Sequence, residues 1–166
     1  MTVEQVLVFT KYFTSRVSYP PDKRKRQSTF IEALETLDDF KIFYGRYQTN
    51  PRICRRCSFK DVVPSEKKSD VNLAVEMITD AYENNFNTAL LISADADLTA
   101  AVLAIKNLFP NKRIVIAFPP QRFSVELAKH AHAYINIGRA NLAKSIFPDE
   151  VQKADGFILK CPDEWR

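Results

Sequence analysis

Two aspartates separated by one residue, Asp95 and Asp97, are the residues best suited to do chemistry in this chain. They come shortly after the apolar run of residues 89–92, which predicts a strand buried on both faces of a parallel sheet. Ligands of open α/β sheets bind at the carboxyl ends of strands, so the two carboxylates are well placed to hold a divalent cation. Alternatively, one aspartate only caps the following helix, because Asp is a favoured N-cap residue. A cap needs one carboxylate and this turn has two, which favours the metal site.

Strand and helix patterns alternate along the rest of the chain and would position this turn. Further strands are predicted at residues 6–13, 40–47, 113–118 and 134–137. Apolar spacing and capping signals predict helices at residues 30–37, 70–81, 98–105, 124–131 and 141–147. This order predicts an α/β fold with a mainly parallel sheet. With 166 residues, 46% of them hydrophobic, residues 1–152 are expected to form one domain and residues 153–166 a tail that packs on it.

Residues 48–65 follow neither period and are predicted to form a long, functional or mobile loop. The loop carries Arg52, Arg55 and Arg56, which would allow it to cover a nucleic-acid strand. Cys54 and Cys57 have the spacing of half a zinc site. Because no second pair follows, free or redox-sensitive thiols are the favoured interpretation.

The composition of the chain limits the classes of function that it can have. The net charge of +4 and the pI near 9.0 are compatible with a polyanionic partner, and only three glycines, far apart, exclude a Gly-rich phosphate loop. The chain has no apolar run of about 20 residues and no secretion signal, so we expect a cytoplasmic protein with no membrane partner. The basic run at residues 23–26 is expected to be a solvated helix entrance first and a phosphate contact second. His130 and His132 are expected to be surface or packing residues.

Six segments spread over nearly the whole chain carry a resemblance to a known family. They are FTKYFTSRV (9–17), RQSTFIEAL (26–34), EKKSDVNLAVEMITDAYENNFNTALLISADADL (66–98), VIAFPP (115–120), ANLAKSIFP (140–148) and LKCPDEW (159–165). The succession resembles the NYN domain family, a branch of the PIN-like nucleases, and its most specific part is EK-x-SDVNLA followed by S-x-D-x-DL. The resemblance implies a Rossmann-like α/β/α sandwich and a divalent-metal-dependent ribonuclease site of clustered aspartates.

Carried over by motif, the resemblance implies that Asp70, Asp95 and Asp97 are the catalytic and metal-binding positions. Hard oxygen ligands of this kind suit Mg²⁺ or Mn²⁺. The expected partner is RNA, whose backbone basic side chains would bind without reading sequence. The expected substrate-binding residues are Lys67, Lys68, Asn72, Ser93, Arg52, Arg55 and Arg56.

One departure from the family pattern bears on activity. Family members ordinarily open with a strand that ends in Asp-Gly-x-Asn, and this motif does not occur in the sequence, so the family's first strand and helix are expected to be absent. Three explanations stay open: a lost N-terminal segment, a strand supplied by a partner subunit, or an inactive copy. The rival functions are an inactive RNA-binding or regulatory module, a phosphate or nucleotide binder, and a structural remnant that forms a homodimer through an exposed sheet edge.

Overall fold

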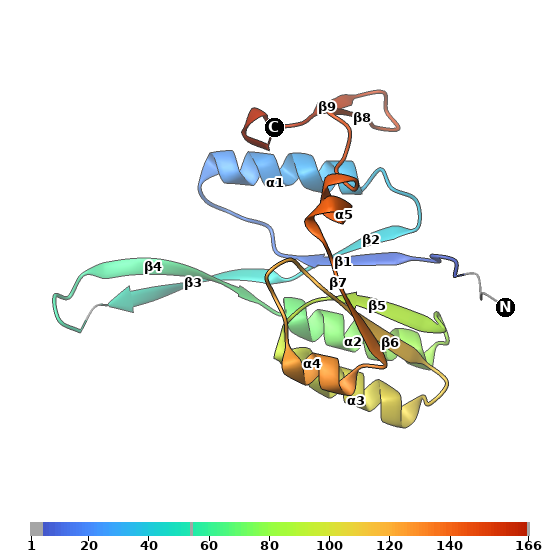
Figure 1. Ribbon diagram of the computed structural model, residues 1–166. Helices are drawn as coiled ribbons and strands as arrows, with labels where there is room; N and C mark the ends of the chain where they lie inside the picture. The colour runs from blue at the N-terminus through green and yellow to red at the C-terminus, as the bar shows by residue number, and fades with distance from the viewer. Residues whose placement is uncertain (1–4, 54, 166) are drawn as a thin grey trace. The chain divides into compact units, whose positions relative to one another are not determined.

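The computed structural model describes residues 5–53 and 55–165, except for the side chains of residues 47–51 and 61–66 (Figure 1). The chain divides into two compact units. Unit 1 comprises Met1–Asn72 together with Phe147–Arg166, and unit 2 comprises Leu73–Ile146. Each unit is described by itself below.

Unit 1 begins with a β-α-β motif. Strand β1 (Thr10–Thr14) pairs in parallel with β2 (Phe40–Tyr44), and helix α1 (Pro21–Leu34) connects them. A parallel pair requires such a crossover, and the proline at the start of α1 has a backbone angle that suits a first helical turn. Phe13 and Phe43 face each other in the register, and their rings stack with centroids 5.0 Å apart. The carboxyl ends of β1 and β2 therefore lie side by side.

An antiparallel ribbon follows β2. Strand β3 (Arg46–Ile53) pairs with β4 (Lys60–Lys67) along its full length, so the prediction of a loop over residues 48–65 is wrong. The two strands form a separate two-stranded sheet, drawn in cyan and green in Figure 1. A ribbon of two strands needs no apolar face, so its sequence lacks the alternation by which a half-buried strand is recognised. The arginines expected on a loop thus lie on or beside the turn of a hairpin.

The C-terminal segment of unit 1 packs on α1. It forms a short hairpin from β8 (Glu150–Gln152) and β9 (Ile158–Lys160), followed by the single-turn helix η2 (Asp163–Trp165). Lys153 Nζ lies 2.9 Å from Glu32 Oε2, and this contact raises the pKa of Lys153. The ring of Trp165 meets that of Phe30 edge-on at 6.1 Å. Both ends of the chain therefore contribute to unit 1.

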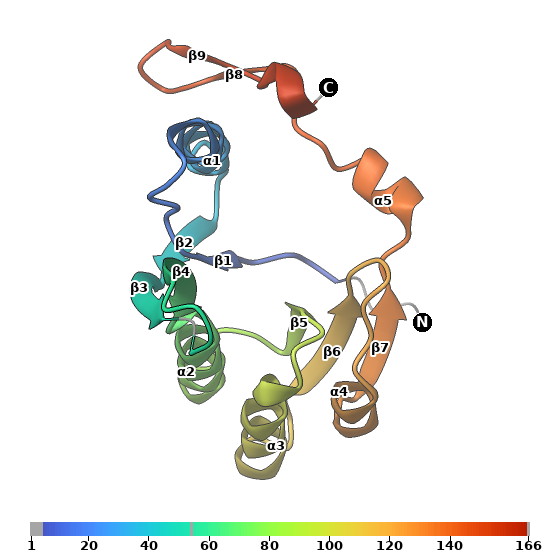
Figure 2. The same ribbon diagram turned by 90° about the vertical axis from the view of Figure 1, so that its left-hand side faces the viewer.

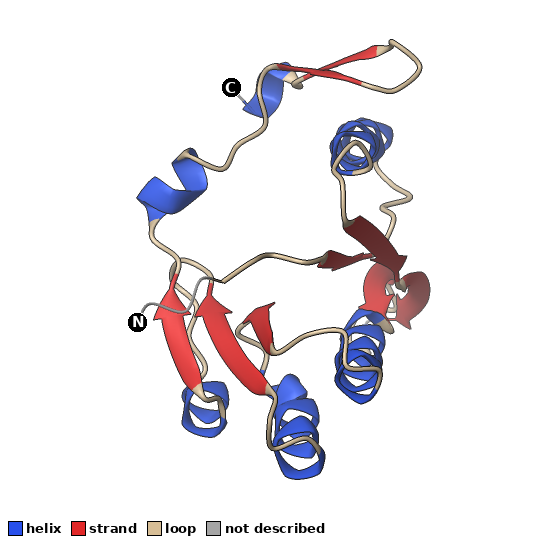
Figure 3. Cartoon of the chain, turned by 90° about the vertical axis from the view of Figure 1, so that its right-hand side faces the viewer, coloured by secondary structure: helices blue, strands red, loops and turns tan. Residues whose placement is uncertain are grey.

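The elements from residue 69 to residue 143 are α2 (Ser69–Tyr82), β5 (Thr88–Ile92), η1 (Ala96–Leu98), α3 (Thr99–Leu108), β6 (Arg113–Phe118), α4 (Val125–His130), β7 (Ala133–Asn136) and α5 (Arg139–Ala143). In unit 2, the three strands form a parallel sheet in the order β5-β6-β7 (Figure 2). Helices α3 and α4 lie on one side of this sheet (Figure 3). Helix α2 begins in unit 1 and adds Leu73, Ala74, Met77 and Ile78 to the same core.

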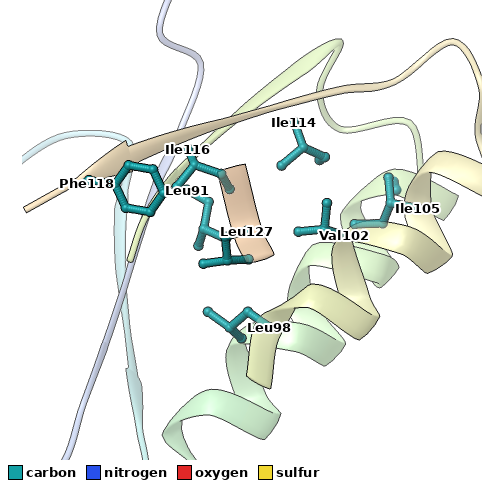
Figure 4. Close-up of a cluster of buried hydrophobic side chains, with 9 residues drawn as sticks. Leu91, Leu98, Val102, Ile105, Ile114, Ile116, Phe118 and Leu127 are labelled. Carbon is teal, nitrogen blue, oxygen red and sulfur yellow. The ribbon is translucent and has the colours of Figure 1, made fainter. Parts of the chain in front are cut away.

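The core of unit 2 lies between the sheet and these helices. The side chains of Val102, Ile105, Ile114, Phe118 and Leu127 are fully buried there (Figure 4). Burying one such side chain stabilises the fold by about 1.5–3 kcal/mol. The core fixes the face that each strand turns toward the helices.

Strand β5 is buried on one face only. Leu91 points into the core and is 7% exposed, whereas Leu90 and Ile92 are 57% and 61% exposed. The prediction of a strand buried on both faces is therefore wrong, because a continuous apolar run does not show whether one or both faces are covered. The predicted α/β class with mainly parallel sheets is confirmed. No helix among the described residues is long and apolar enough to cross a membrane.

Candidate functional site

The turn after β5 is held by two successive side chain to backbone hydrogen bonds. Ser93 Oγ accepts from the backbone N–H of Asp95 at 3.1 Å, and Asp95 Oδ1 accepts from the backbone N–H of Asp97 at 3.0 Å. Asp95 is thereby the N-cap of η1, and buried Leu98 anchors the end of that helix in the core. Both aspartates remain exposed. The local sequence thus holds the Asp95 carboxylate and places Asp97 two residues further on, both at the carboxyl end of β5.

The capping hydrogen bond uses only one of the carboxylate oxygens of Asp95 and Asp97. Among the described residues, no hydrogen bond reaches the second oxygen of Asp95 or the carboxylate of Asp97. The next residue after the helix, Thr99, is 5% exposed, and its Oγ1 is buried without a partner from the described part of the chain. An unpaired buried hydroxyl is uncommon and costly. The turn therefore keeps more oxygen acceptors than its own hydrogen bonds use.

A second set of expected site residues lies in unit 1, where α2 begins. Asp70 lies exposed in the first turn of α2, and Asn72 Nδ2 donates to the carbonyl oxygen of Tyr44 at 3.3 Å, at the end of β2. Lys67 and Lys68 are exposed just before the helix, and Lys68 has a left-handed backbone with φ of 76°. Residues other than glycine with a left-handed backbone carry strain, and such residues are concentrated at functional sites.

Gly45 lets the start of α2 approach the ends of β1 and β2. A Cβ atom at this position would collide with the side-chain oxygens of Ser15 and Ser69 and would lie 2.8 Å from the carbonyl oxygen of Lys67. The two serine oxygens are 3.5 Å apart. The glycine is therefore required by a close approach and holds the first turn of α2, with Asp70, at these strand ends.

Arg16 and Tyr44 are candidate residues that the sequence did not reveal. The Arg16 guanidinium donates to Tyr44 Oη at 2.9 Å and lies 4.7 Å from the centre of its ring. Both side chains are exposed where β1 and β2 end. Arg16 follows the strand predicted at residues 6–13, which is the same signal that identified Asp95, whereas Tyr44 lies inside the strand predicted at residues 40–47 and gave no such signal. The pair presents a cation and an aromatic ring to solvent.

The expected site residues fall into three groups. The start of α2 brings together Lys67, Lys68, Asp70 and Asn72, and the turn after β5 brings together Ser93, Asp95 and Asp97. Arg52, Arg55 and Arg56 are exposed around the hairpin turn between β3 and β4. Asp70 belongs to unit 1 and the aspartate pair to unit 2, and no cluster of three or more His, Cys, Asp or Glu able to hold a metal occurs among the described residues.

The cysteines and histidines that the structure describes show no such grouping. Cys57 is an exposed free thiol and Cys161 a partly buried one, while Cys54 lies outside the described residues. His132 Nδ1 accepts from the backbone N–H of Ile114 at 3.0 Å, at the amino ends of β6 and β7 and away from Asp95. Burial first, then Lys106 and Arg113, lowers the pKa of His132. The side chain of His132 is exposed, and its hydrogen bond ties it to the amino end of β6.

Comparison with known proteins identifies a family and a fold. The family model described as NYN domain matches residues 5–142. A solved structure of a protein of unknown function from Vibrio parahaemolyticus is similar with a TM-score of 0.54 and 22% identity, covering 80% of this chain and 70% of that chain. At this identity, the likeness shows the fold alone. No curated protein sequence matches the chain.

Proposed function

Because the chain belongs to the NYN domain family, which has a PIN-like nuclease fold, we propose that it is a divalent-metal-dependent ribonuclease. The observation that carries this proposal is the turn after β5, where Asp95 and Asp97 expose carboxylate oxygens that capping does not use. The proposed ligands are Asp70, Asp95 and Asp97. The substrate is the phosphodiester backbone of RNA.

The chemistry of these ligands fits Mg²⁺ or Mn²⁺. All three are carboxylates, the hard oxygen donors that these ions prefer, and all three are exposed. When bound, such an ion supplies Lewis-acid polarisation of the scissile phosphate and a lower pKa for the attacking water. The bond from Asp97 N–H to Asp95 Oδ1 fixes the direction of the Asp95 carboxylate before any ligand arrives. Preorganisation of this kind avoids rearrangement during the reaction.

Basic side chains in unit 1 are proposed to hold the RNA backbone. Lys67 and Lys68 are exposed next to Asp70, and Arg52, Arg55 and Arg56 supply three further charges from the hairpin. Contacts of this type position a strand without reading its sequence.

Two uncharged side chains are proposed to orient the substrate near the acids. Ser93 Oγ already accepts from Asp95 N–H, which leaves its hydroxyl proton for a phosphate oxygen. The amide of Asn72 is held in place by the carbonyl of Tyr44 and keeps its oxygen as an acceptor for a ribose hydroxyl.

The experiment is cleavage of an end-labelled single-stranded RNA in Mn²⁺ and in EDTA. We expect product from the wild-type chain in Mn²⁺ only, and no product from Asp95→Asn. Asp38→Asn removes the same charge from an exposed turn between α1 and β2 and serves as the matched control, with cleavage retained. Undiminished cleavage by Asp95→Asn would refute the assignment.

A catalytically inactive RNA-binding module is the second candidate. The observation in its favour is that neither unit by itself holds a metal-binding cluster of three acids among its described residues. This candidate predicts salt-sensitive RNA binding without product and without a metal requirement.

A further inference from the structure

An open pocket of about 350 Å³ lies in unit 2 where β6 and β7 end. Its volume falls within the range of small-ligand sites. None of the residues that line it is acidic, and one is a cation, so an anionic ligand is not repelled. The lining includes Pro119, Pro120, Gln121, Arg122, Phe123 and Asn136.

One wall of the pocket is an aromatic ring held at a fixed position. Phe123 packs on the fully buried ring of Phe118, with centroids 4.4 Å apart, and meets Tyr134 edge-on at 5.5 Å. Despite these contacts, Phe123 is 51% exposed. A large apolar ring that is anchored yet half-exposed offers a preformed surface for stacking.

The loop that carries Phe123 is tightly turned. Arg122 N–H donates to the carbonyl oxygen of Pro119 at 3.1 Å, which closes a four-residue turn with Pro120 at its second position. Gln121, at the third position, has a φ of 62°. Proline followed by a left-handed residue is the type II arrangement, and glutamine is strained there. The turn projects Gln121 and Arg122 next to Phe123 in one defined arrangement.

The pocket and the aspartate turn share one edge of one sheet. Ile92 of β5 pairs with Ala117 of β6, which in turn pairs with Ile135 of β7, so the three strands end together. Adjacent strands lie about 4.8 Å apart, which separates the ends of β5 and β7 by about 10 Å. A single nucleic-acid strand lying along this edge would reach both places.

We propose that this pocket binds one nucleobase of a single-stranded RNA, which stacks on Phe123 while Arg122 contacts a neighbouring phosphate. The amides of Gln121 and Asn136 offer both donors and acceptors to the edge of the base. Aromatic stacking beside a cation is how single strands are bound without a strict sequence requirement. The proposal rests on the proposed function, since it adds a base-binding subsite to the same sheet edge as Asp95.

The test measures binding of a fluorescently labelled ten-nucleotide uridine RNA in Ca²⁺, together with the Mn²⁺ cleavage assay. Phe123→Ala should weaken the affinity about five- to a hundred-fold, because base stacking contributes on that scale. Phe123→Trp should restore it. Phe157→Ala removes another phenylalanine that is more than half exposed, from the C-terminal hairpin, and should leave the RNA affinity unchanged. Circular dichroism of each variant checks folding.

A second arm separates recognition of the base from recognition of the sugar phosphate. Uridine monophosphate and ribose 5-phosphate are titrated into the ¹⁵N-labelled chain, and the amide signals of residues 121–123 are followed. Shifts with uridine monophosphate but not with ribose 5-phosphate support base recognition. Equal shifts with both ligands overturn it.

The pocket proposal and the proposed ribonuclease activity can be refuted independently by these assays. Unchanged RNA affinity in Phe123→Ala overturns the pocket proposal even where Asp95-dependent cleavage is seen. Weakened affinity in Phe123→Ala without cleavage by the wild-type chain supports the pocket and overturns the nuclease. No binding and no cleavage by the wild-type chain overturns both.

Discussion

The backbone N–H of Asp97 donates to the carboxylate of Asp95 at 3.0 Å. One side chain therefore caps a helix and supplies a proposed metal ligand. These two roles can be separated by substitution, because asparagine caps as well as aspartate but carries no charge.

Asp95→Asn should leave the free energy of unfolding within about 0.5 kcal/mol of wild type, whereas Asp95→Ala should lower it by about 1 kcal/mol. Both substitutions should abolish metal-dependent cleavage. Urea denaturation, monitored by circular dichroism, measures the free energy of unfolding. An equal loss of stability in both variants would show that the charge, and not the cap, stabilises the turn.

The hairpin between β3 and β4 should contribute to RNA affinity through charge alone. Replacing Arg52, Arg55 and Arg56 with alanine should make the slope of log K against log salt shallower by about 2, since each phosphate contact to a single strand contributes about 0.7. Filter binding between 50 and 300 mM salt, roughly the range in which such contacts are screened, measures the slope.

The control for the hairpin is the exposed basic run of α1. Replacing Lys23, Arg24 and Lys25 with alanine makes the same change in net charge. If this variant alters the slope and the hairpin variant does not, the phosphate contacts belong to α1.

Gly45→Ala should destabilise the protein by about 1–3 kcal/mol, because the added methyl group collides with two serine side chains and approaches a backbone oxygen. Gly138→Ala is the matched control, since a Cβ there meets nothing within 4 Å. Its effect should stay within about 0.5 kcal/mol. Thermal unfolding of both variants provides the comparison, and equal melting temperatures would argue against the close approach.

Protonation of His132 should weaken the fold at mildly acidic pH. Its pKa is lowered in the folded chain, so the unfolded chain binds a proton first as the pH falls below about 6.5. Stability contributed by the neutral imidazole is complete above that pH and declines below it. His132→Asn keeps an acceptor for the Ile114 amide and should flatten the melting temperature between pH 7.5 and about 5.5. Parallel curves for the two proteins would contradict this.

Elements with strong local signals were predictable from sequence. The strand at residues 113–118 is β6 as observed, and the helix predicted at 70–81 is Ser69–Tyr82, because its apolar side chains recur at the helical period. The hairpin at β3 and β4 was missed because its residues show no alternation. The exposure of Leu90 and Ile92 depends on what covers the sheet, which a single apolar strand does not encode.

In the candidate site, too, the local features could be predicted from the sequence and the long-range contacts could not. The turn at Asp95 and Asp97 is a local motif, and its hydrogen bonds span two residues. In contrast, Ser15 and Ser69 meet across 54 positions of sequence, and Arg16 reaches Tyr44 across 28. Long-range pairs of this kind follow from the fold and leave no periodic trace in the sequence.

The composition of unit 1 from both ends of the chain has a consequence for biosynthesis. A ribosome makes α1 before unit 2, and it makes Phe147 and Trp165, which pack edge-on against Phe30, after unit 2. Domains fold as units while they emerge. The nascent chain therefore carries a complete unit 2 before α1 has met the rings of Phe147 and Trp165, and a premature stop codon before Phe147 would leave the aspartate turn intact but remove both rings that pack on Phe30.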